Sequence, residues 1–454
     1  MIDNKEELLA NGNEEGRKAC LDVIEYALES IEPSRGIEKN VGIEDGMLKL
    51  FSEEFELDEV ENLYVLGAGK ASYNMARAIE EILSDKIAEG IVITKYGYRE
   101  TELKNIRVVE AGHPVPDDSG QEAANEILRI AEDAGERDLV INLISGGGSA
   151  LLCAPVEPVS LDEMQKATDL LVASGATINE INAVRKHVSR IKGGRLARSI
   201  QPATCVSLIV SDVVGNPLDV IASGPTVPDT TTFEDAYRVL ENYSLLEEVP
   251  GAVLDYVNDG RDGKVMESVE EDEFADMKVH NLVISSNDKA TEAVAEKAEE
   301  LDLEPLILSR MIEGESKEAG IVFAGIVKDV VRTGTPLDPP AMLISGGETT
   351  VSLGEKEGEG GPNQEFALGA ATKISGLDGI VVAAVDTDGT DGPTEAAGGI
   401  VDGKTAEKFS QENMNLSEVL KSHDSKPALE KLNDLIVTGP TGTNVNDLRI
   451  AVVL

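Results

Sequence analysis

Residues 62–83, NLYVLGAGKASYNMARAIEEIL, predict the fold of this chain most directly. An apolar run at 63–66 leads into Gly67 and Gly69, and a helical pattern follows at once. A buried strand, a glycine turn and a helix in this order form the start of a βαβ unit in an α/β fold. Lys70 stands where the helix opens, and the amides and dipole of a helix N-terminus favour an anion. We expect Gly67, Gly69 and Lys70 to bind a phosphate or carboxylate; a structural turn with a surface lysine is the alternative.

The same order of apolar run, glycine and helical pattern recurs in two series along the 454 residues. The first series occupies 62–215 and the second 280–453, with a charged stretch of weak periodicity between them. We therefore predict two α/β domains. Residues 1–260 form a Rossmann-like, mainly parallel sheet domain and residues 261–454 a smaller domain, with the boundary at 245–278.

The glycine turn departs from the nucleotide-binding signatures. Residues 67–72 read G-x-G-x-x-S, and the next predicted strand ends in Lys95, where a dinucleotide fold places an acidic ribose ligand. The spacing does not match the Walker A loop either. The four histidines are scattered, and we expect His113 only to order a proline turn.

The chain carries 85 Asp and Glu against 40 Lys and Arg, a formal charge of −45. This excess disfavours binding to nucleic acid or to an anionic membrane surface, and no apolar run reaches the roughly 20 residues of a membrane span. The acidic residues are spread over nearly all predicted helices, as in proteins of a salt-loaded halophilic cytoplasm; an unusually acidic mesophilic protein is the alternative. Three cysteines without metal or disulfide spacing, and no targeting segment, predict a reducing, cytoplasmic location.

A second glycine-rich turn follows the predicted strand at 139–144. Its three adjacent glycines let a backbone approach an anion closely, and a serine on either side adds a hydroxyl donor. The residues of this turn are Ser145, Gly146, Gly147, Gly148 and Ser149. We expect them to bind an anion; a flexible connector is the alternative.

The cations of this acidic chain gather in residues 181–211, which contain no Asp or Glu. They are Arg185, Lys186, Arg190, Lys192, Arg195 and Arg198. Such a cluster can neutralise a polyanionic ligand, for example a nucleoside triphosphate together with an organic acid. A solvated basic face is the usual alternative, and the acidic surroundings make us prefer the ligand.

Aspartates follow two further predicted strands, Asp212 after one and Asp386, Asp388 and Asp391 after the other. Ligands of α/β folds bind at the carboxyl ends of strands. Mg²⁺ takes one or two carboxylates together with phosphate oxygens and water. We expect a magnesium site at Asp386, Asp388 and Asp391 and a functional carboxylate at Asp212; an Asx-rich turn is the alternative for each.

Nine stretches in order along nearly the whole chain carry a family pattern. They are GAGKAS (67–72), GHPVPD (112–117), ISGGGSALL (144–152), INAVRKHVSRIKGGRLA (181–197), SDVVGNPLDVIASGPTVPD (211–229), ISGGETTV (344–351), GGPNQEFAL (360–368), DTDGTDGPTEAAG (386–398) and TGPTGTNVNDL (438–448). Together they resemble the class II glycerate kinases, the glycerate 2-kinase family with a C-terminal MOFRL domain. The resemblance implies a Rossmann-like domain and a smaller α/β domain with a mixed sheet, with the active site in the cleft between them. It also implies MgATP-dependent phosphorylation of D-glycerate, usually at the 2-hydroxyl.

The family pattern extends the set of expected site residues. Lys70 is similar to the cleft lysine of the family, and the two SGG turns would face nucleotide or substrate. The resemblance implies contacts to substrate or ATP from Lys192, Gly346, Gly347, Glu348, Asn363, Gln364, Thr390 and Asn444. Many relatives have arginine where this chain has Pro362, so either a cation from 185–198 supplies that charge or the substrate lies in another orientation. Small molecules are the expected partners, and a homodimer is compatible with the pattern.

We therefore hypothesise in-line transfer of the γ-phosphoryl group of ATP to glycerate. Lys70 with Arg185 or Lys192 would stabilise the phosphates and the carboxylate, and Asp212 would orient or deprotonate the attacking hydroxyl. Two alternatives stay open: an NAD(P)H-dependent hydroxypyruvate reductase, and a protein that binds a nucleotide or sugar acid without turnover.

Overall fold

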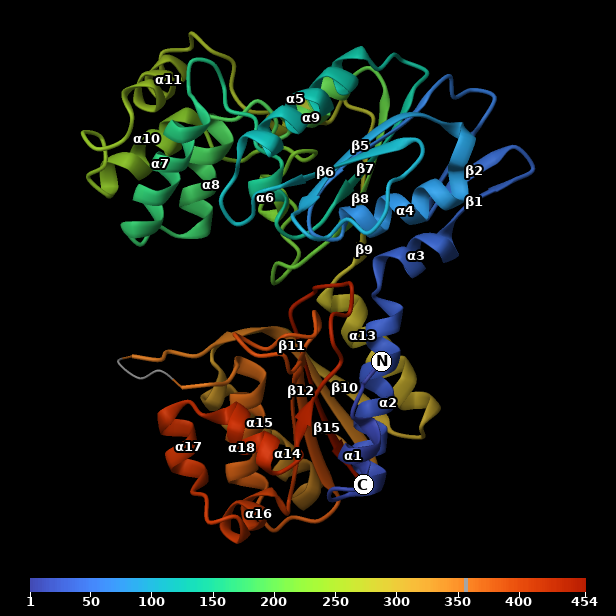
Figure 1. Ribbon diagram of the computed structural model, residues 1–454, viewed down its shortest axis with the longest axis vertical. Helices are drawn as coiled ribbons and strands as arrows, with labels where there is room; N and C mark the ends of the chain where they lie inside the picture. Colours follow the sequence, from blue (N-terminus) through green and yellow to red (C-terminus); the bar gives the residue numbers. More distant parts are fainter. Residues whose placement is uncertain (355–357) are drawn as a thin grey trace. The chain divides into compact units, whose positions relative to one another are not determined.

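The chain forms two compact units in the computed structural model, which describes residues 1–354 and 358–454 (Figure 1). The parallel-sheet unit is Pro33–Ile284. The mixed-sheet unit combines Met1–Glu32 with Ser285–Leu454. The units therefore differ from the predicted division at residue 260, and the N-terminal segment belongs with the C-terminal one.

Long-range packing accounts for this difference. Strand β9 (Val279–Ser285) joins the edge of the parallel sheet and so extends that unit beyond the predicted boundary. Helix α2 (Glu14–Ser30) packs in the mixed-sheet unit, where its buried Arg17 forms ion pairs with Asp402 at 3.0 Å and Asp434 at 2.8 Å. Both arrangements join segments far apart along the chain, so local sequence patterns carry no signal for them.

A six-stranded sheet forms the centre of the parallel-sheet unit, in the order β6-β5-β4-β7-β8-β9. Its other strands are β4 (Leu63–Ala68), β5 (Ile87–Lys95), β6 (Ile106–Ala111), β7 (Leu139–Ile144) and β8 (Thr204–Val210). The pairs β6/β5, β5/β4, β4/β7 and β7/β8 are parallel. Counted from β4, the order is 3-2-1-4-5-6, which is the Rossmann order. Ligands of such folds bind where the strand order reverses, at the carboxyl ends of β4 and β7.

Helices and a small meander surround this sheet. The helices are α3 (Pro33–Asn40), α4 (Ser72–Leu83), α5 (Asp118–Asp133), α6 (Gly148–Leu151), α7 (Leu161–Ala173), α8 (Ile178–His187), α9 (Arg195–Ile200), α10 (Phe233–Asn242), α11 (Gly251–Arg261) and α12 (Glu271–Phe274), with 3₁₀ turns at Ser84–Lys86 and Ile221–Ser223. The meander is β1 (Val41–Glu44), β2 (Met47–Leu50) and β3 (Glu53–Glu56), paired antiparallel. Helices α5 and α9 share one apolar core with β4, β5 and β7, and α7, α8, α10 and α11 enclose a separate core, green to yellow in Figure 1.

A six-stranded mixed sheet forms the centre of the mixed-sheet unit, in the order β10-β11-β15-β12-β13-β14. Its strands are β10 (Glu304–Glu315), β11 (Ala341–Thr350), β12 (Ile380–Asp386), β13 (Gly398–Asp402), β14 (Leu435–Ile436) and β15 (Asp447–Val453). Only β10/β11 among these pairs is parallel; the other four are antiparallel. The last strand of the chain, β15, therefore lies in the middle of the sheet and brings Asp447 between the ends of β11 and β12.

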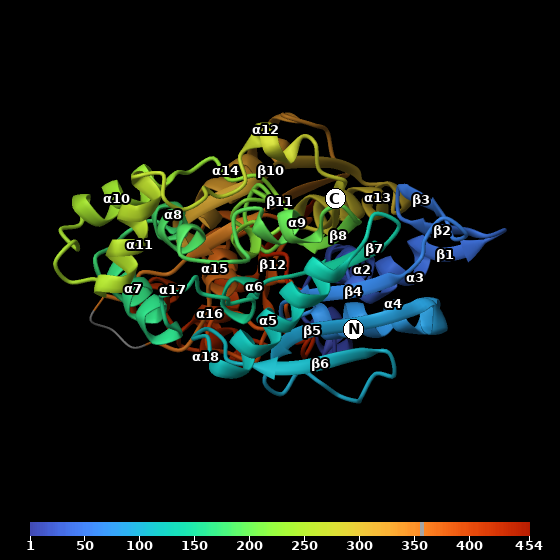
Figure 2. The same ribbon diagram turned by 90° about the horizontal axis from the view of Figure 1, so that it is seen from above.

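Helices cover both faces of the mixed sheet. They are α1 (Lys5–Leu9), α2, α13 (Asn287–Glu300), α14 (Ser316–Thr333), α15 (Pro362–Ile374), α16 (Thr405–Gln411), α17 (Leu416–Ser422) and α18 (Ser425–Lys431). Figure 1 shows α2 and α13 on one side of the sheet and α15, α17 and α18 on the other, and Figure 2 gives the view at right angles. The predicted α/β class, with a Rossmann-like parallel sheet and a second, mixed-sheet domain, is confirmed. Within residues 1–354 and 358–454 no helix is both long and apolar enough to cross a bilayer.

Candidate active site

The two glycine turns of the parallel-sheet unit meet at the carboxyl ends of β4 and β7. Lys70 donates its backbone N–H to Gly146 O at 2.9 Å, and Ala71 donates to Ser145 Oγ at 3.0 Å. Gly69 has φ +143°, and a Cβ there would stand 2.1 Å from Ser145 Oγ. Glycine is therefore required at 69, because a side chain would force the two turns apart.

Lys70, His113 and Asp212 gather around the second turn. A Cβ on Gly146 would lie 2.0 Å from Asp212 Oδ2. A Cβ on Gly147 would lie 2.9 Å from His113 Cδ2 and 3.4 Å from Lys70 Cγ. The turn thus brings a cation, an imidazole and a carboxylate from three separate segments to two adjacent glycines.

The environment of this group changes its acid–base chemistry. Burial raises the pKa of Asp212, although the charge of Lys70 acts in the opposite direction. Burial lowers the pKa of His113, and the nearby Lys70 and Lys95 lower it further. A carboxylate that is more basic than usual beside a fixed cation suits the removal of a hydroxyl proton.

The six cations of the stretch 181–211 fall into two groups. Four of them bond to neighbouring residues of the fold or lie at the surface. Lys186 pairs with Asp229 at 3.3 Å and Asp219 at 3.5 Å. Arg198 pairs with Glu273, Arg195 Nη1 donates to Ser189 O at 3.0 Å, and the exposed Arg190 donates to Asn125 Oδ1 at 3.1 Å. These four cations hold the local fold or lie at the surface, so the prediction of a ligand for the whole cluster does not extend to them.

Arg185 and Lys192 have a different environment. Arg185 Nη2 donates to Ser149 O at 3.0 Å, and Lys192 Nζ donates to the same oxygen at 2.7 Å. Burial lowers the pKa of both, and burial together with the charge of Arg185 lowers the pKa of Lys192 to about 7. Neither forms an ion pair with a carboxylate anywhere in 1–354 or 358–454.

The mixed-sheet unit gathers a second polar group at the ends of β11, β12 and β15. Asn446 Nδ2 donates to Glu348 Oε2 at 3.0 Å, and Thr349 N donates to Asp447 Oδ2 at 3.1 Å. Arg449, which is fully buried, forms a short ion pair with Asp447. The glycines before Glu348 allow this packing, since a Cβ on Gly346 would lie 1.6 Å from Asn287 Oδ1 and Gly347 has φ +117°.

Asp386 and Asp388 form the carboxylate pair of this group. Asp388 donates its N–H to Asp386 Oδ1 at 3.0 Å. Asp388 itself accepts from Thr390 N at 2.8 Å and from Asn444 Nδ2 at 3.3 Å. Burial, followed by the negative charge of Asp388, raises the pKa of Asp386 to about 8. Ionisation of both carboxylates at once is therefore unfavourable unless a cation lies nearby.

Asp391 plays a different part in the structure. Its Oδ1 accepts from Asn363 N and its Oδ2 from Gln364 N, both at 2.9 Å, at the start of α15. Pro362 occupies the first turn of this helix, where its missing N–H and fixed φ do not destabilise the helix. Burial raises the pKa of Asp391 to about 7. The side chains of Asn363 and Gln364 are buried, and Gln364 bonds to Thr394, so both are tied into the fold.

The fit of these residues to Mg²⁺ depends on the donor set. Within the described ranges no three His, Cys, Asp or Glu side chains are arranged to hold a metal by themselves. Mg²⁺ commonly takes only one or two carboxylates and completes its shell with phosphate oxygens and water. The raised pKa of Asp386 shows that this pair would gain from a nearby cation. Asp386 and Asp388 fit such a site, while the oxygens of Asp391 already accept amide hydrogens.

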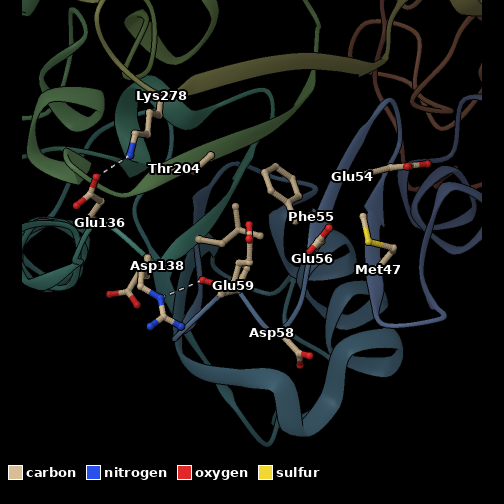
Figure 3. Close-up of a pocket in the computed structure, with 13 residues that line it drawn as sticks. Met47, Glu54, Phe55, Glu56, Asp58, Glu59, Glu136, Asp138, Thr204 and Lys278 are labelled. Carbon is tan, nitrogen blue, oxygen red and sulfur yellow. Dashed lines mark hydrogen bonds and ion pairs between the residues drawn. The ribbon is translucent and has the colours of Figure 1, made fainter.

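Two cavities of the parallel-sheet unit differ in position. One, of about 760 Å³, lies between the β1–β3 meander and the first residues of β7 and β8, with six acidic side chains around it (Figure 3). Its Lys278 pairs with Glu136 at 3.7 Å. It lies at the amino ends of the strands, away from the end where α/β folds bind ligands. The other, of about 110 Å³, contains Ser149, Arg185 and Lys192.

Comparison with known proteins identifies the family. The domain of unknown function DUF4147 matches residues 19–258 and the MOFRL family matches 341–447. The chain is 48% identical to the glycerate 2-kinase of Pyrococcus horikoshii, over 96% of this chain and 97% of that protein. The chain belongs to the glycerate 2-kinase family. The resemblance predicted from the nine motifs is therefore confirmed.

Two further relatives of the glycerate 2-kinase family are informative. The crystal structure of a glycerate kinase from Thermotoga maritima superposes with a TM-score of 0.87 at 39% identity, over 96% of this chain and 99% of that one. A protein of Agrobacterium vitis named as a putative hydroxypyruvate reductase is 42% identical, over 85% of this chain and 97% of that protein.

Sequence reasoning missed several residues of the site. His113 was expected only to order a proline turn, yet it lies against Gly147. Asp447 lies within the motif 438–448 and Arg449 directly after it, but neither was expected in the site, because the strand that holds them becomes central only on folding. Ser223, whose hydroxyl lies 2.8 Å from Ser149 Oγ, lies within the motif 211–229 but was not among the expected site residues.

Proposed function

We propose that this protein is a glycerate 2-kinase, which transfers the γ-phosphoryl group of ATP to the 2-hydroxyl of D-glycerate. The observation that carries the proposal is the 48% identity to a glycerate 2-kinase along 96% of the chain. The cytoplasm is the proposed location, and the three buried, unpaired cysteines suit a reducing compartment.

The proposed chemistry is an in-line displacement. The 2-hydroxyl oxygen forms the new bond to the γ-phosphorus, the bond to the bridging oxygen of ADP breaks, and the hydroxyl proton passes to Asp212. Lys70, held at the turn against Gly147, stabilises the charge on the transferred group.

The proposed metal ligands lie in the mixed-sheet unit. Asp386 and Asp388 would hold Mg²⁺, with Asn444 orienting Asp388. When bound, the ion neutralises charge on the β- and γ-phosphates. Asp391 acts through Asn363 and Gln364 as a positioning residue, and Glu348, Gly346, Gly347 and Thr390 complete the proposed contacts to ATP or substrate.

A reductase is the second candidate, since the Agrobacterium vitis relative carries that name. Against it, β5 ends in Lys95 at the position where a dinucleotide fold needs an acidic group for the ribose hydroxyls. The G-x-G-x-x-S turn also lacks the third glycine.

The test is ³¹P NMR of the purified protein with MgATP and D-glycerate in about 2 M KCl, a salt concentration that screens the acidic surface. A 2-phosphoglycerate resonance that grows together with ADP supports the proposal. 3-Phosphoglycerate would correct the regiochemistry and point to Pro362 as the altered position. NAD(P)H oxidation with hydroxypyruvate and no phosphorylated product would replace the kinase by the reductase.

A further inference from the structure

Arg185, which is half-buried, and Lys192, which is fully buried, form a pair of cations without a carboxylate partner in residues 1–354 and 358–454. Both donate to the single carbonyl oxygen of Ser149, at 3.0 Å and 2.7 Å. An ammonium has three donors and a guanidinium five, so this one acceptor leaves most of their hydrogen-bonding capacity unused. Lys192 is only 1% exposed, so acceptors for its remaining donors have to come from within the small pocket that it lines.

Within residues 1–354 and 358–454, Arg185 and Lys192 are the two cations of the stretch 181–211 whose side chains share one carbonyl acceptor and contact no carboxylate. Lys186, which follows Arg185 in α8, lies between Asp219 and Asp229. By contrast, only the Cys153 thiol raises the pKa of Arg185 or Lys192, and burial outweighs it in both cases. Burying a cation such as Lys192 without an anion destabilises the protein. A bound anion would supply the missing partner.

The pocket in front of the cations is small. Its volume is about 110 Å³; apolar side chains that include Cys153, Leu161 and Met164 line it, together with Gln165, Thr168 and the exposed Asp169. That volume corresponds to a few water molecules at roughly 30 Å³ each. Pockets for larger ligands start at roughly 300 Å³. A carboxylate with a short carbon chain fits such a space, and a nucleotide does not.

The pocket is connected to the reacting groups through the second glycine turn. Ser149 follows Gly146, which packs against Asp212, by three positions. Three residues span at most about 11 Å. The backbone of Ser149 therefore lies no more than about 11 Å from that of Gly146, which packs against Asp212.

A strained turn holds Ser149 in place. Ser223 Oγ lies 2.8 Å from Ser149 Oγ and donates to Asn182 Oδ1 at 3.1 Å. Ser223 and Ala222 both have positive φ, 60° and 51°, which costs energy for residues with a Cβ. This turn fixes the carbonyl that orients both cations, so the pocket is built before any ligand arrives.

We propose that Arg185 and Lys192 bind the carboxylate of the acceptor, and that the pocket around them restricts the acceptor to short hydroxy acids. The proposal rests on the proposed kinase function and specifies its acceptor site. It separates the tasks of the cations: Lys70 serves the transferred phosphoryl group, and Arg185 with Lys192 serve the acid.

The experiment compares Arg185→Met and Lys192→Met with Arg190→Met, a matched control for an exposed cation of the same stretch. We expect KM for D-glycerate to rise about 10- to 100-fold in the first two variants, the range of a lost charge-assisted hydrogen bond. KM for ATP should change less than about threefold, which is well below the change expected for the loss of one charge-assisted hydrogen bond. Equal increases in both KM values would assign the cations to the phosphates and overturn the proposal.

A binding measurement separates this proposal from the kinase proposal. We expect D-glycerate without ATP to raise the melting temperature of the wild type and of Arg190→Met, but not of the two pocket variants. Glycerol, which lacks the carboxylate, should have no effect on any of them. If the wild type shows these melting-temperature shifts but does not phosphorylate D-glycerate, the kinase proposal is refuted and the carboxylate site stands. If D-glycerate still raises the melting temperature of both pocket variants, the carboxylate site is refuted.

Discussion

Replacing Lys192 by methionine should stabilise the ligand-free protein. Burial and the charge of Arg185 lower the pKa of Lys192 from 10.5 to about 7. At about 1.4 kcal/mol per pH unit, this difference corresponds to on the order of 5 kcal/mol of penalty for the buried charge. Removal of the charge also removes the hydrogen bond to Ser149, worth about 1 kcal/mol. We therefore expect Lys192→Met to raise the free energy of unfolding by about 1–4 kcal/mol at pH 6–7, as for other buried charges replaced by apolar groups.

The pH dependence of the free energy of unfolding follows from the lowered pKa of Lys192. Between pH 7 and 10.5 the unfolded chain holds a proton on Lys192 that the folded protein has released. The free energy of unfolding of the wild type therefore rises with pH across this window, and below pH 7 the penalty is present in full. The advantage of Lys192→Met should accordingly be largest at pH 6–7 and disappear towards pH 10.5.

The assay is urea unfolding of the wild type, Lys192→Met and Arg190→Met at fixed KCl from pH 6 to 10. The difference between two variants cancels the titration of all other groups. A Lys192→Met variant that is no more stable at pH 6, or an advantage that does not change with pH, would show that Lys192 is neutralised in the folded protein. The argument for a missing anion would then fail.

Three other perturbations have defined outcomes. Lys70→Ala should lower kcat about 10²- to 10³-fold in a coupled ADP assay, as expected for loss of a donor to the transferred group, and full turnover would remove Lys70 from the mechanism. Gly69→Ala should reduce both activity and melting temperature, because its Cβ would lie 2.1 Å from Ser145 Oγ; wild-type values would mean that the two turns are not packed together. Raising KCl from about 0.1 M to 2 M should increase the free energy of unfolding, because salt screens the repulsion within a chain of charge −45. A stability independent of KCl would contradict the halophilic interpretation.

The contrast between Lys70 and Arg185 shows which parts of the site are visible in sequence. Lys70 follows a strand and a glycine turn that are contiguous in the chain, so its place at the carboxyl end of β4 could be predicted. No local sequence pattern distinguishes the six cations of 181–211 from one another. Only the folded chain brings Asp219 and Asp229 to Lys186, and among the described residues it places no carboxylate at ion-pair distance from Arg185 or Lys192.

The sequence by itself determined the α/β class, the two series of strands, the glycine turns and the family, because buried strands and tight turns leave periodic, contiguous patterns. The tertiary structure decided which polar groups meet. It moved the N-terminal helix into the C-terminal unit, placed β15 between β11 and β12, and divided the aspartates into the pair Asp386 and Asp388 and the helix-positioning Asp391. The physical reason is that burial, countercharge and hydrogen bonding depend on neighbours distant in the chain, and these neighbours determine whether a charged side chain supports the fold or awaits a ligand.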